Sequence, residues 1–182
     1  MVIEKITEGS ARILAYTGRI QEISKKAAVF FNPAMKHNRD ISVLALTVFQ
    51  EDLVAREKLK IAKYEGSAKI DANQELIEVQ SESKESQKYR KNAKTGIIVA
   101  DCLSATGVRG IRYSLEAPGI EEVIFSDLNP TAIRLIKKNV KSNKVKNATV
   151  EQEDAVITLS RRKGKIDFLD IRSGKGTLMI RS

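Results

Sequence analysis

Hydrophobic and polar positions divide the N-terminal part of the chain into a weak strand pair and a helix. Residues 2–17 hold two short apolar runs separated by the turn composition "TEGS", which predicts a small β-hairpin. In the run "ISVLALTVFQEDLVAREKLK", over residues 41–60, apolar residues recur at helical spacing. The members of this stripe are Ile41, Leu44, Ala45 and Val48, and Asp52 is the first to leave it. We expect a helix here, preceded by Pro33 and capped by Asn38 or Asp40.

From Gly96 onward, apolar runs and helical patterns alternate. Four segments have the pattern of strands: residues 96–105, 121–127, 147–154 and 165–171. Three segments between them have the pattern of helices: residues 107–117, 129–143 and 155–162. Asn129 and Pro130 provide a cap and a favoured first residue for the second of these helices. Strands that alternate with helices at this spacing predict an α/β protein with a doubly wound parallel sheet.

Two stretches do not fit this pattern. Residues 64–95 are polar and highly charged, which predicts a surface insertion or linker. The last stretch, "RSGKGTLMIRS", has no helical pattern, so we expect the sheet to be incomplete there, with an unpaired edge. We therefore expect four parts: an N-terminal hairpin and helix extension (1–63), the linker (64–95), a Rossmann-like half domain (96–171) and a tail (172–182).

Net charge adds a candidate partner. The 182 residues carry a formal charge of +9, with a pI of about 9.6. Between Thr131 and Lys165 there are ten Lys or Arg and three acids. Lysine and arginine bind phosphates by releasing counterions, so this balance favours a nucleic-acid partner. The alternative is a basic protein whose lysines only line solvated helix faces.

Three sequence features concern the location of the chain. No window approaches the roughly 18 uninterrupted apolar residues of a membrane helix. The start "MVIEKITEGS" lacks the apolar region of a signal peptide. Cys102 is the single cysteine, which fits a reducing compartment, and we expect it to be a small buried apolar residue. We expect a cytoplasmic protein without a membrane partner.

The loop after the first strand of the half domain has the composition of a ligand-binding turn. "DCLSATGVRG" contains Asp101 at the strand end and the small residues Ala105, Gly107 and Gly110 before the next helix. Small residues let a ligand approach the backbone, and ligands of doubly wound sheets bind at the carboxyl ends of the strands. As a variant of G-x-G-x-x-G, with Ala105 at the first glycine, the pattern is weak by itself.

Acidic residues end the next two strands. Asp127 follows Gly107 by twenty residues, where a carboxylate can accept hydrogen bonds from both hydroxyls of a ribose. Together with the loop, Asp127 indicates a nucleoside-bearing cofactor, since Asn129 already provides the helix cap. Asp154 could accept a hydrogen bond from an adenine amino group, or only cap the helix that begins at Ala155.

The loop composition favours S-adenosylmethionine over a dinucleotide. A pyrophosphate requires close backbone approach and normally a glycine where this chain has Ala105, whereas S-adenosylmethionine has no phosphates. Asp101 can face the amine of this cofactor, and Arg109 can pair with its carboxylate. An NAD-dependent oxidoreductase is the least favoured alternative, because it also needs a substrate domain. No residues are assigned to a metal.

Four stretches together resemble a known family. "FFNPAMKHNRD" (30–40), "DCLSATGVRGIRYSLE" (101–116), "SDLNPTAIRLIKKNVKSN" (126–143) and "EDA" (153–155) are similar to motifs of the tRNA (guanine-26 N2)-dimethyltransferases. The resemblance covers residues 1–50 and 96–171. It implies a class I methyltransferase fold, S-adenosylmethionine as cofactor, tRNA as partner and methyl transfer to the exocyclic N2 of a guanine.

The resemblance also implies individual roles. Its cofactor contacts fall on five residues: Arg39, Arg109, Asp127, Asp154 and Ala155. Arg39 would otherwise be interpreted as an exposed arginine before a helix. The motif implies that Phe30 packs against the target guanine, although a core role for Phe30 is equally compatible with the sequence. Tyrosine is usual where this chain has Phe31, and we assign no role to His37.

The last strand departs from the family pattern. The resemblance implies Asp-x-Asp-Pro-Phe-Gly there, whose second aspartate holds the amino group of guanine. Asp170 matches the first aspartate, but Arg172 replaces the second, and the proline and phenylalanine are absent. A cation cannot accept the departing proton, so the catalytic residue is unknown, with Asp170 the nearest candidate. We expect a truncated or frame-shifted, inactive copy of such an enzyme, or alternatively a non-catalytic RNA- or cofactor-binding remnant.

Overall fold

The computed structural model describes five segments of the chain: residues 2–17, 29–67, 88, 96–173 and 176–180. The chain divides into two compact units, Met1–Thr47 with Ile97–Ser182 and, separately, Val48–Gly96. Most of the expected linker at 64–95 lies outside the described residues, so the predicted domain boundaries remain predictions. Every residue of the candidate site belongs to the first unit.

The N-terminal hairpin is present as predicted. β1 (Val2–Glu8) and β2 (Ala11–Thr17) pair antiparallel around a turn that includes Gly9. Alternate side chains of β2 are buried because successive strand residues point to opposite faces, and Ala11 and Ile13 are at most 2% exposed. These side chains pack in one hydrophobic core with Ile111 and Phe125 of the Rossmann-like part. The hairpin is therefore an integral part of the first unit.

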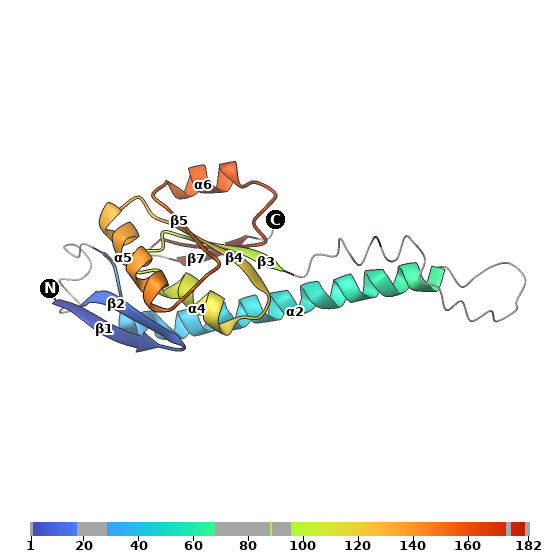
Figure 1. Ribbon diagram of the computed structural model, residues 1–182, viewed down its shortest axis with the longest axis horizontal. Helices are drawn as coiled ribbons and strands as arrows, with labels where there is room; N and C mark the ends of the chain where they lie inside the picture. The colour runs from blue at the N-terminus through green and yellow to red at the C-terminus, as the bar shows by residue number, and fades with distance from the viewer. Residues whose placement is uncertain (1, 18–28, 68–87, 89–95, 174–175, 181–182) are drawn as a thin grey trace, which may run out of the picture. The chain divides into compact units, whose positions relative to one another are not determined.

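A five-stranded sheet forms the centre of this unit (Figure 1). Its strands are β3 (Ile97–Cys102), β4 (Ile120–Ser126), β5 (Ala148–Glu151), β6 (Phe168–Ser173) and β7 (Gly176–Ile180). Their order is β5-β4-β3-β6-β7, with the first four parallel. This confirms the predicted doubly wound sheet. The strand order reverses between β3 and β6, and sheets of this kind bind ligands at such a switch point.

Helices cover both faces of the sheet (Figure 1). α4 (Val108–Glu116) and α5 (Pro130–Ser142) pack with the hairpin on one face, and α6 (Ala155–Arg161) packs on the other. α5 begins as predicted: the Asn129 side chain accepts a hydrogen bond from the Thr131 N–H, and Pro130 is the first helical residue. The position where α5 begins thus follows from Asn129 and Pro130.

The helix predicted over residues 41–60 is present but begins earlier. A short 3-10 helix, η1 (Pro33–Met35), leads directly into α2 (Lys36–Ser67). The predicted caps Asn38 and Asp40 are wrong, because both lie inside α2. Asn32 starts the helical path instead, since its side chain accepts a hydrogen bond from Ala34 N at 2.9 Å. Although α2 is long, no helix of the described segments is long and apolar enough to cross a membrane.

The apolar stripe predicted on this helix does not face the core. Ile41 and Leu44 are 62% and 63% exposed, whereas Arg39 and Ser42 are buried. Besides the apolar Leu46, the buried face carries polar side chains that have hydrogen-bonding partners: Arg39 binds Glu8, and Ser42 accepts from Arg109. The helical spacing of apolar residues therefore predicted the helix correctly but predicted the wrong buried face.

The expectation of an unpaired edge beside the last parallel strand is also wrong. β7 pairs antiparallel with β6, with Ile171 opposite Leu178 and Arg172 opposite Thr177 (Figure 1). The segment Gly176–Ile180 contains apolar and β-branched residues, which favour a strand. β6 therefore has a hydrogen-bonded neighbour on each side.

Two asparagines, one in α5 and one at its C-cap, attach the hairpin to the Rossmann-like part. Asn139 is fully buried, and its amide accepts from Leu14 N at 2.8 Å and donates to Leu14 O at 3.0 Å. One turn later, Asn143 makes the same pair of bonds to Arg12, at 2.8 and 2.6 Å. Residues four apart share a helix face, and residues two apart share a strand edge. The helix thereby satisfies the free edge of β2.

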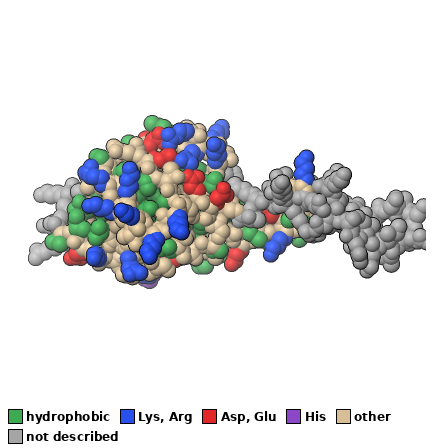
Figure 2. Space-filling view, in the orientation of Figure 1, with side chains coloured by type: hydrophobic (Ala, Val, Ile, Leu, Met, Phe, Trp, Pro, Cys, Tyr) green, Lys and Arg blue, Asp and Glu red, His purple; other side chains and the backbone are tan. Residues whose placement is uncertain are grey.

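The two outer helices differ in their charged surfaces (Figure 2). Residues 130–148, which include α5, hold six Lys or Arg and no acid: Arg134, Lys137, Lys138, Lys141, Lys144 and Lys146. All six are exposed. At α6, in contrast, Arg161 pairs with Glu151 at 2.7 Å and with Glu153 at 3.0 Å, and Arg162 pairs with Glu151 at 2.6 Å. Positive charge is thus uncompensated along α5 and largely neutralised at α6.

Candidate functional site

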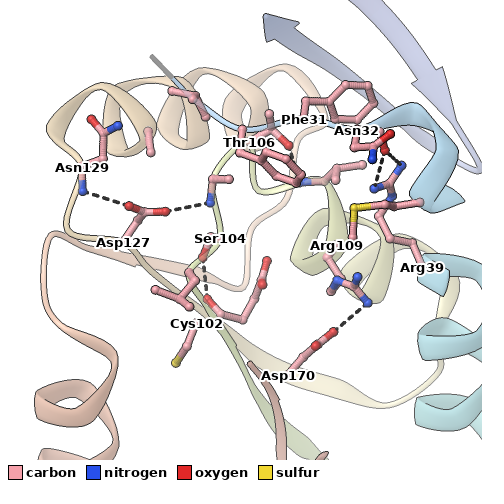
Figure 3. A pocket seen from close by; sticks show the side chains of 18 residues that line it. Phe31, Asn32, Arg39, Cys102, Ser104, Thr106, Arg109, Asp127, Asn129 and Asp170 are labelled. Carbon is pink, nitrogen blue, oxygen red and sulfur yellow. Dashed lines mark hydrogen bonds and ion pairs between the residues drawn. The ribbon is translucent and has the colours of Figure 1, made fainter. Parts of the chain in front are cut away.

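A cavity of about 630 Å³ lies at the carboxyl ends of β3, β4 and β6 (Figure 3). Its walls come from four places: residues 29–39, the loop after β3, the turn into α5, and the end of β6. The volume falls within the range of roughly 300–1,000 Å³ that is typical of small-molecule sites. Four of the predicted cofactor residues line it together: Arg39, Asp101, Arg109 and Asp127.

The loop after β3 turns through three left-handed backbone positions. Leu103, Ala105 and Gly107 have φ angles of 64°, 52° and 74°. Glycine adopts this conformation readily, whereas other residues are held in it by their surroundings, often at functional sites. Ala105 therefore occupies a conformation that suits glycine. Gly107 itself precedes α4 as its N-cap and is not among the residues that line the cavity.

Asp127 holds this loop in place. Its Oδ2 accepts a hydrogen bond from Ala105 N at 2.9 Å, and its Oδ1 accepts from Asn129 N at 2.9 Å (Figure 3). A carboxylate has about four acceptor positions, so the two oxygens can still accept further bonds from a ligand. Asp127 thus fixes the β3–α4 loop and the start of α5 to one another at the edge of the cavity.

Gly110 brings α4 close to the sheet. A Cβ atom at this position would lie 2.4 Å from the ring of Phe125, so no other residue fits without displacing that ring. The close approach allows the Gly110 N–H to donate to Oδ2 of Asp101 at 3.0 Å. The small residue that the sequence placed in this turn therefore serves helix packing and the orientation of Asp101.

Two aspartates meet at the switch point of the sheet. Asp101 on β3 lies directly opposite Asp170 on β6, and the two residues are 4% and 1% exposed. Burial, and next the charge of Asp170, raise the pKa of Asp101 to about 7, while Arg109 and the Gly110 N–H oppose the rise. Near neutral pH, Asp101 therefore populates both its protonated and its ionised form.

Arg109 binds one oxygen of Asp170. Its Nη1 lies 3.0 Å from Asp170 Oδ2, and the same oxygen accepts a hydrogen bond from the Tyr113 hydroxyl. The guanidinium also donates to Ser42 Oγ at 2.6 Å and to Asn38 Oδ1 at 2.9 Å. Arg109 lines the cavity as predicted. It already contacts Asp170, Ser42 and Asn38, so the predicted pairing with a ligand carboxylate would be a fourth contact.

The second oxygen of Asp170 has no hydrogen-bond partner among the described residues. Oδ1 is buried and makes no hydrogen bond within the described part of the chain. An unpaired buried oxygen costs roughly 1–3 kcal/mol, and more when it carries charge. Because Asp170 lines the cavity, a donor on a ligand would satisfy this oxygen.

Arg39 is buried, not exposed before a helix. It is 5% exposed, and its guanidinium forms two short bonds to the Glu8 carboxylate, at 2.6 and 2.5 Å. It also donates to Asn32 O at 3.2 Å and lies 5.3 Å from the centre of the Phe31 ring. Arg39 therefore lines the cavity while tying residues 31–32 to the hairpin.

The adjacent phenylalanines have different surroundings. Phe31 is 3% exposed and belongs to the hydrophobic core, whereas Phe30 is 47% exposed at the cavity. The core alternative for Phe30 is thus excluded, and its predicted contact with a base remains a prediction. Cys102 is 1% exposed as expected, and burial, followed by the charge of Asp101, raises the pKa of its thiol to about 12.

The remaining two predicted cofactor residues lie elsewhere. Asp154 caps α6, since its Oδ1 accepts from Val156 N at 2.8 Å. Ala155 packs against the core beneath that helix. Neither is among the residues that line the cavity; Asp154 caps α6, and its predicted contact with adenine stays a prediction.

Three contacts of the site were not anticipated from the sequence. The pairing of Asp101 with Asp170 could have been predicted from the sequence, because the first and fourth strands of a half Rossmann sheet are neighbours and each ends near an aspartate. Ser42 and Glu8 offered no such signal. They reach Arg109 and Arg39 from positions 67 and 31 residues away in the chain.

The chain is similar to a family of RNA-modifying enzymes. A family model described as "N2,N2-dimethylguanosine tRNA methyltransferase" matches residues 9–173. The tRNA (guanine(26)-N(2))-dimethyltransferase of Methanothermobacter thermautotrophicus is 34% identical over 169 residues, covering 91% of this chain and 32% of that protein. The protein of the same name from Schizosaccharomyces pombe is 30% identical over 180 residues, covering 91% and 31%. The chain thus spans about a third of the length of these relatives.

A solved structure also matches. It is described as Trm1 from Pyrococcus horikoshii in complex with S-adenosyl-L-methionine. The sequence identity is 25% and the TM-score is 0.46, covering 98% of this chain and 30% of the solved one.

Proposed function

The chain belongs to the N2,N2-dimethylguanosine tRNA methyltransferase family, and we propose that it forms the S-adenosylmethionine-binding part of a tRNA (guanine-26 N2)-dimethyltransferase. One observation carries this proposal. Within the matched residues, the carboxyl ends of three parallel strands bring Asp101, Asp127 and Asp170 to one cavity. The activity, the tRNA substrate and the cofactor all belong to this proposal.

The residues of the cavity suit the proposed cofactor. Asp127 has acceptor positions left for the two hydroxyls of a ribose, beside a loop that has Ala105 where a pyrophosphate-binding loop normally has glycine. Asp101 and Asp170 place negative charge where a cationic amino-acid group can bind, and Phe30 exposes an aromatic ring at the same cavity. When bound, S-adenosylmethionine supplies an activated methyl group. The chain's own contribution is to position this group and to exclude water from the buried acids.

The tRNA substrate is supported by the surface of α5. Its four exposed Lys and Arg residues, together with Lys144 and Lys146 just after its end, lie in a stretch without acids, which suits a phosphate backbone. Because Asn129, which caps α5, lines the cavity, the basic helix starts at the rim of the proposed cofactor site.

The acceptor side of the reaction has no assigned base. Transfer to N2 of guanine breaks the bond between methyl and sulfur, forms a bond to nitrogen and releases one proton from that nitrogen. Arg172 stands where the family resemblance implies the aspartate that holds this amino group, and an arginine does not accept a proton. In addition, β6 continues through Ser173 into pairing with β7. These observations favour a second candidate function, a family member that binds the cofactor and RNA without completing the transfer.

A transfer assay separates the two functions. The purified chain is incubated with methyl-labelled S-adenosylmethionine and a tRNA transcript that carries guanine at position 26, with an adenine-26 transcript as control. Retention of labelled cofactor on the protein is measured in parallel. Label in the guanine-26 transcript alone establishes the enzyme, whereas retention of the cofactor without transfer supports the second candidate. A folded chain that does neither contradicts the proposal.

A further inference from the structure

A buried ion pair joins the hairpin to the wall of the cavity. The Glu8 carboxylate accepts hydrogen bonds from Arg39 Nε at 2.6 Å and from Arg39 Nη2 at 2.5 Å. The two residues are 4% and 5% exposed. Arg39 lines the cavity (Figure 3), whereas Glu8 is not among the residues that line it. Any influence of Glu8 on a ligand in the cavity therefore acts through Arg39.

Glu8 is the counterion of Arg39. It also lies 3.1 Å from Arg112 Nη1, but Arg112 pairs in addition with Asp40 at 2.7 Å and with Glu116 at 2.9 Å. Among the described residues, Glu8 is the only acid that forms an ion pair with Arg39. Without the charge of Glu8, Arg112 would keep two acidic partners, and Arg39 would keep none of those described.

This ion pair changes the net charge that a ligand meets. The charged residues that line the cavity are two arginines and three aspartates: Arg39, Arg109, Asp101, Asp127 and Asp170. Taken alone, these five side chains carry at most one net negative charge. Because Glu8 neutralises Arg39, the effective excess rises to as much as two negative charges. An acid outside the lining thus makes the cavity more favourable for a cation.

A cavity of this kind distinguishes ligands that differ by one charge. At an effective dielectric constant of about 20, a charge roughly 10–20 Å from a ligand changes its affinity by about 4- to 15-fold. In the proposed function the ligand is S-adenosylmethionine, which has one net positive charge. Loss of its methyl group converts the sulfonium into a neutral thioether, and the product S-adenosylhomocysteine has no net charge.

We propose that Glu8, by neutralising Arg39, shifts the preference of the cavity toward the charged methyl donor and away from its neutral product. The proposal rests on the proposed function and adds a determinant of product release to it. Glu8 is a positioning residue, because it holds and neutralises an arginine of the cavity wall without lining the cavity itself.

Two substitutions with opposite effects on charge test the proposal. Glu8→Gln leaves Arg39 without its counterion, and Arg39→Met removes the cation while Glu8 keeps Arg112. Titration calorimetry measures the affinities of each chain for S-adenosylmethionine and S-adenosylhomocysteine, and their ratio is the readout. Glu8→Gln is expected to lower the preference for S-adenosylmethionine by about 3- to 10-fold, and Arg39→Met to raise it by a similar factor.

A double variant and a matched control separate charge from structure. Glu8→Gln combined with Arg39→Met removes both charges, so the ratio is expected to return to within about twofold of the wild type. Glu4→Gln removes an exposed acid of the same strand, β1, and is expected to leave the ratio unchanged. A purely structural role of Glu8 would weaken both ligands alike and would not give opposite shifts that cancel.

An unchanged ratio in either single variant, shifts in the same direction, or a double variant that does not restore the ratio overturns the role of Glu8. These outcomes leave the proposed function intact as long as both ligands bind. If Glu8→Gln does not fold, Arg39→Met and the double variant decide the case, because neither leaves Arg39 buried without a counterion. Binding of neither ligand by the folded wild-type chain overturns both the role of Glu8 and the proposed function.

Discussion

β3 and β6 are neighbours in the sheet, and each brings a buried aspartate to the same cavity, but the chain leaves the two strands differently. After Cys102 it turns through left-handed residues into α4, and Asp127 holds the turn. After Asp170, β6 continues to Ser173 and pairs with β7. One strand end is a loop that faces the cavity, and the other is a continued strand.

This difference separates the two halves of the proposed reaction. A loop at a strand end leaves backbone and small side chains available to a ligand, whereas a continued strand commits its N–H and C=O groups to its neighbour. The β3 end has the features of a cofactor site. The β6 end contributes the side chain of Asp170, and beyond it the chain has a β-ladder where the family resemblance implied a catalytic loop.

Arg109→Met is expected to have the largest effect. It leaves Asp170 and Asp101 buried side by side without their cation and removes the bonds to Ser42 and Asn38. Loss of one partner of a buried pair typically costs about 3–5 kcal/mol of unfolding free energy. Urea denaturation measures this cost, with the exposed Arg134→Met as control. A loss below about 1 kcal/mol would show that the two strand ends do not depend on this cation.

The protonation of Asp101 is expected to make stability depend on pH. Its pKa is about 7 in the folded chain, above the ordinary value of 3.8, so ionisation opposes folding. This opposition is absent below about pH 4 and grows until about pH 7. Relative to Asp101→Asn, the unfolding free energy of the wild type is expected to fall by about 3 kcal/mol from pH 5 to pH 8. Denaturation of both proteins at each pH measures the difference, and parallel profiles would contradict the buried pair.

Asp127→Ala is expected to have an intermediate effect, on the β3 end alone. The substitution removes the hydrogen bonds to Ala105 N and Asn129 N, each typically worth about 1.5–3 kcal/mol when a charged group is involved. Faster amide hydrogen exchange is expected at these two positions, while exchange at Leu178 in β7 stays unchanged. Uniformly faster exchange in both regions would show that the loop is not held locally by Asp127.

Removal of β7 is expected to have the smallest effect on the cavity. A chain that ends at Ser173 loses the ladder beside β6 but keeps every residue named above as lining the cavity. Its unfolding free energy is expected to drop by about 2 kcal/mol, from five cross-strand pairs. Its affinity for S-adenosylmethionine is expected to stay within about threefold of the full chain. A large loss of affinity in a folded protein would make β7 part of the cofactor site.

The regular elements of the fold were predictable because their signals are local. Asn129 and Pro130 mark the start of α5, and the apolar run after Gly96 marks β3. The buried face of α2 was not predictable, because Arg39 is buried by a partner 31 residues away and not by its own hydrophobicity. β7 was missed because five residues of mixed apolar character favour a strand only when a neighbouring edge is available.

The site was predictable where residues follow strand ends. Asp101, Arg109 and Asp127 meet at the cavity, as the loop positions implied. Asp154 follows a strand end too, but its carboxylate caps α6, the alternative that the sequence had left open. The pairing of Asp101 with Asp170 follows only when the strand order of a doubly wound sheet is applied, in which the first and fourth strands are neighbours.

The central claim is that S-adenosylmethionine binds in this cavity, and an NMR titration of the nitrogen-15-labelled chain tests it most directly. The amides of Ala105, Gly110 and Asn129 each donate to a cavity aspartate and should report the ligand. The account predicts saturable shifts at these three amides and none at Lys5 in β1. A folded chain whose three amides do not move as S-adenosylmethionine is added would contradict it.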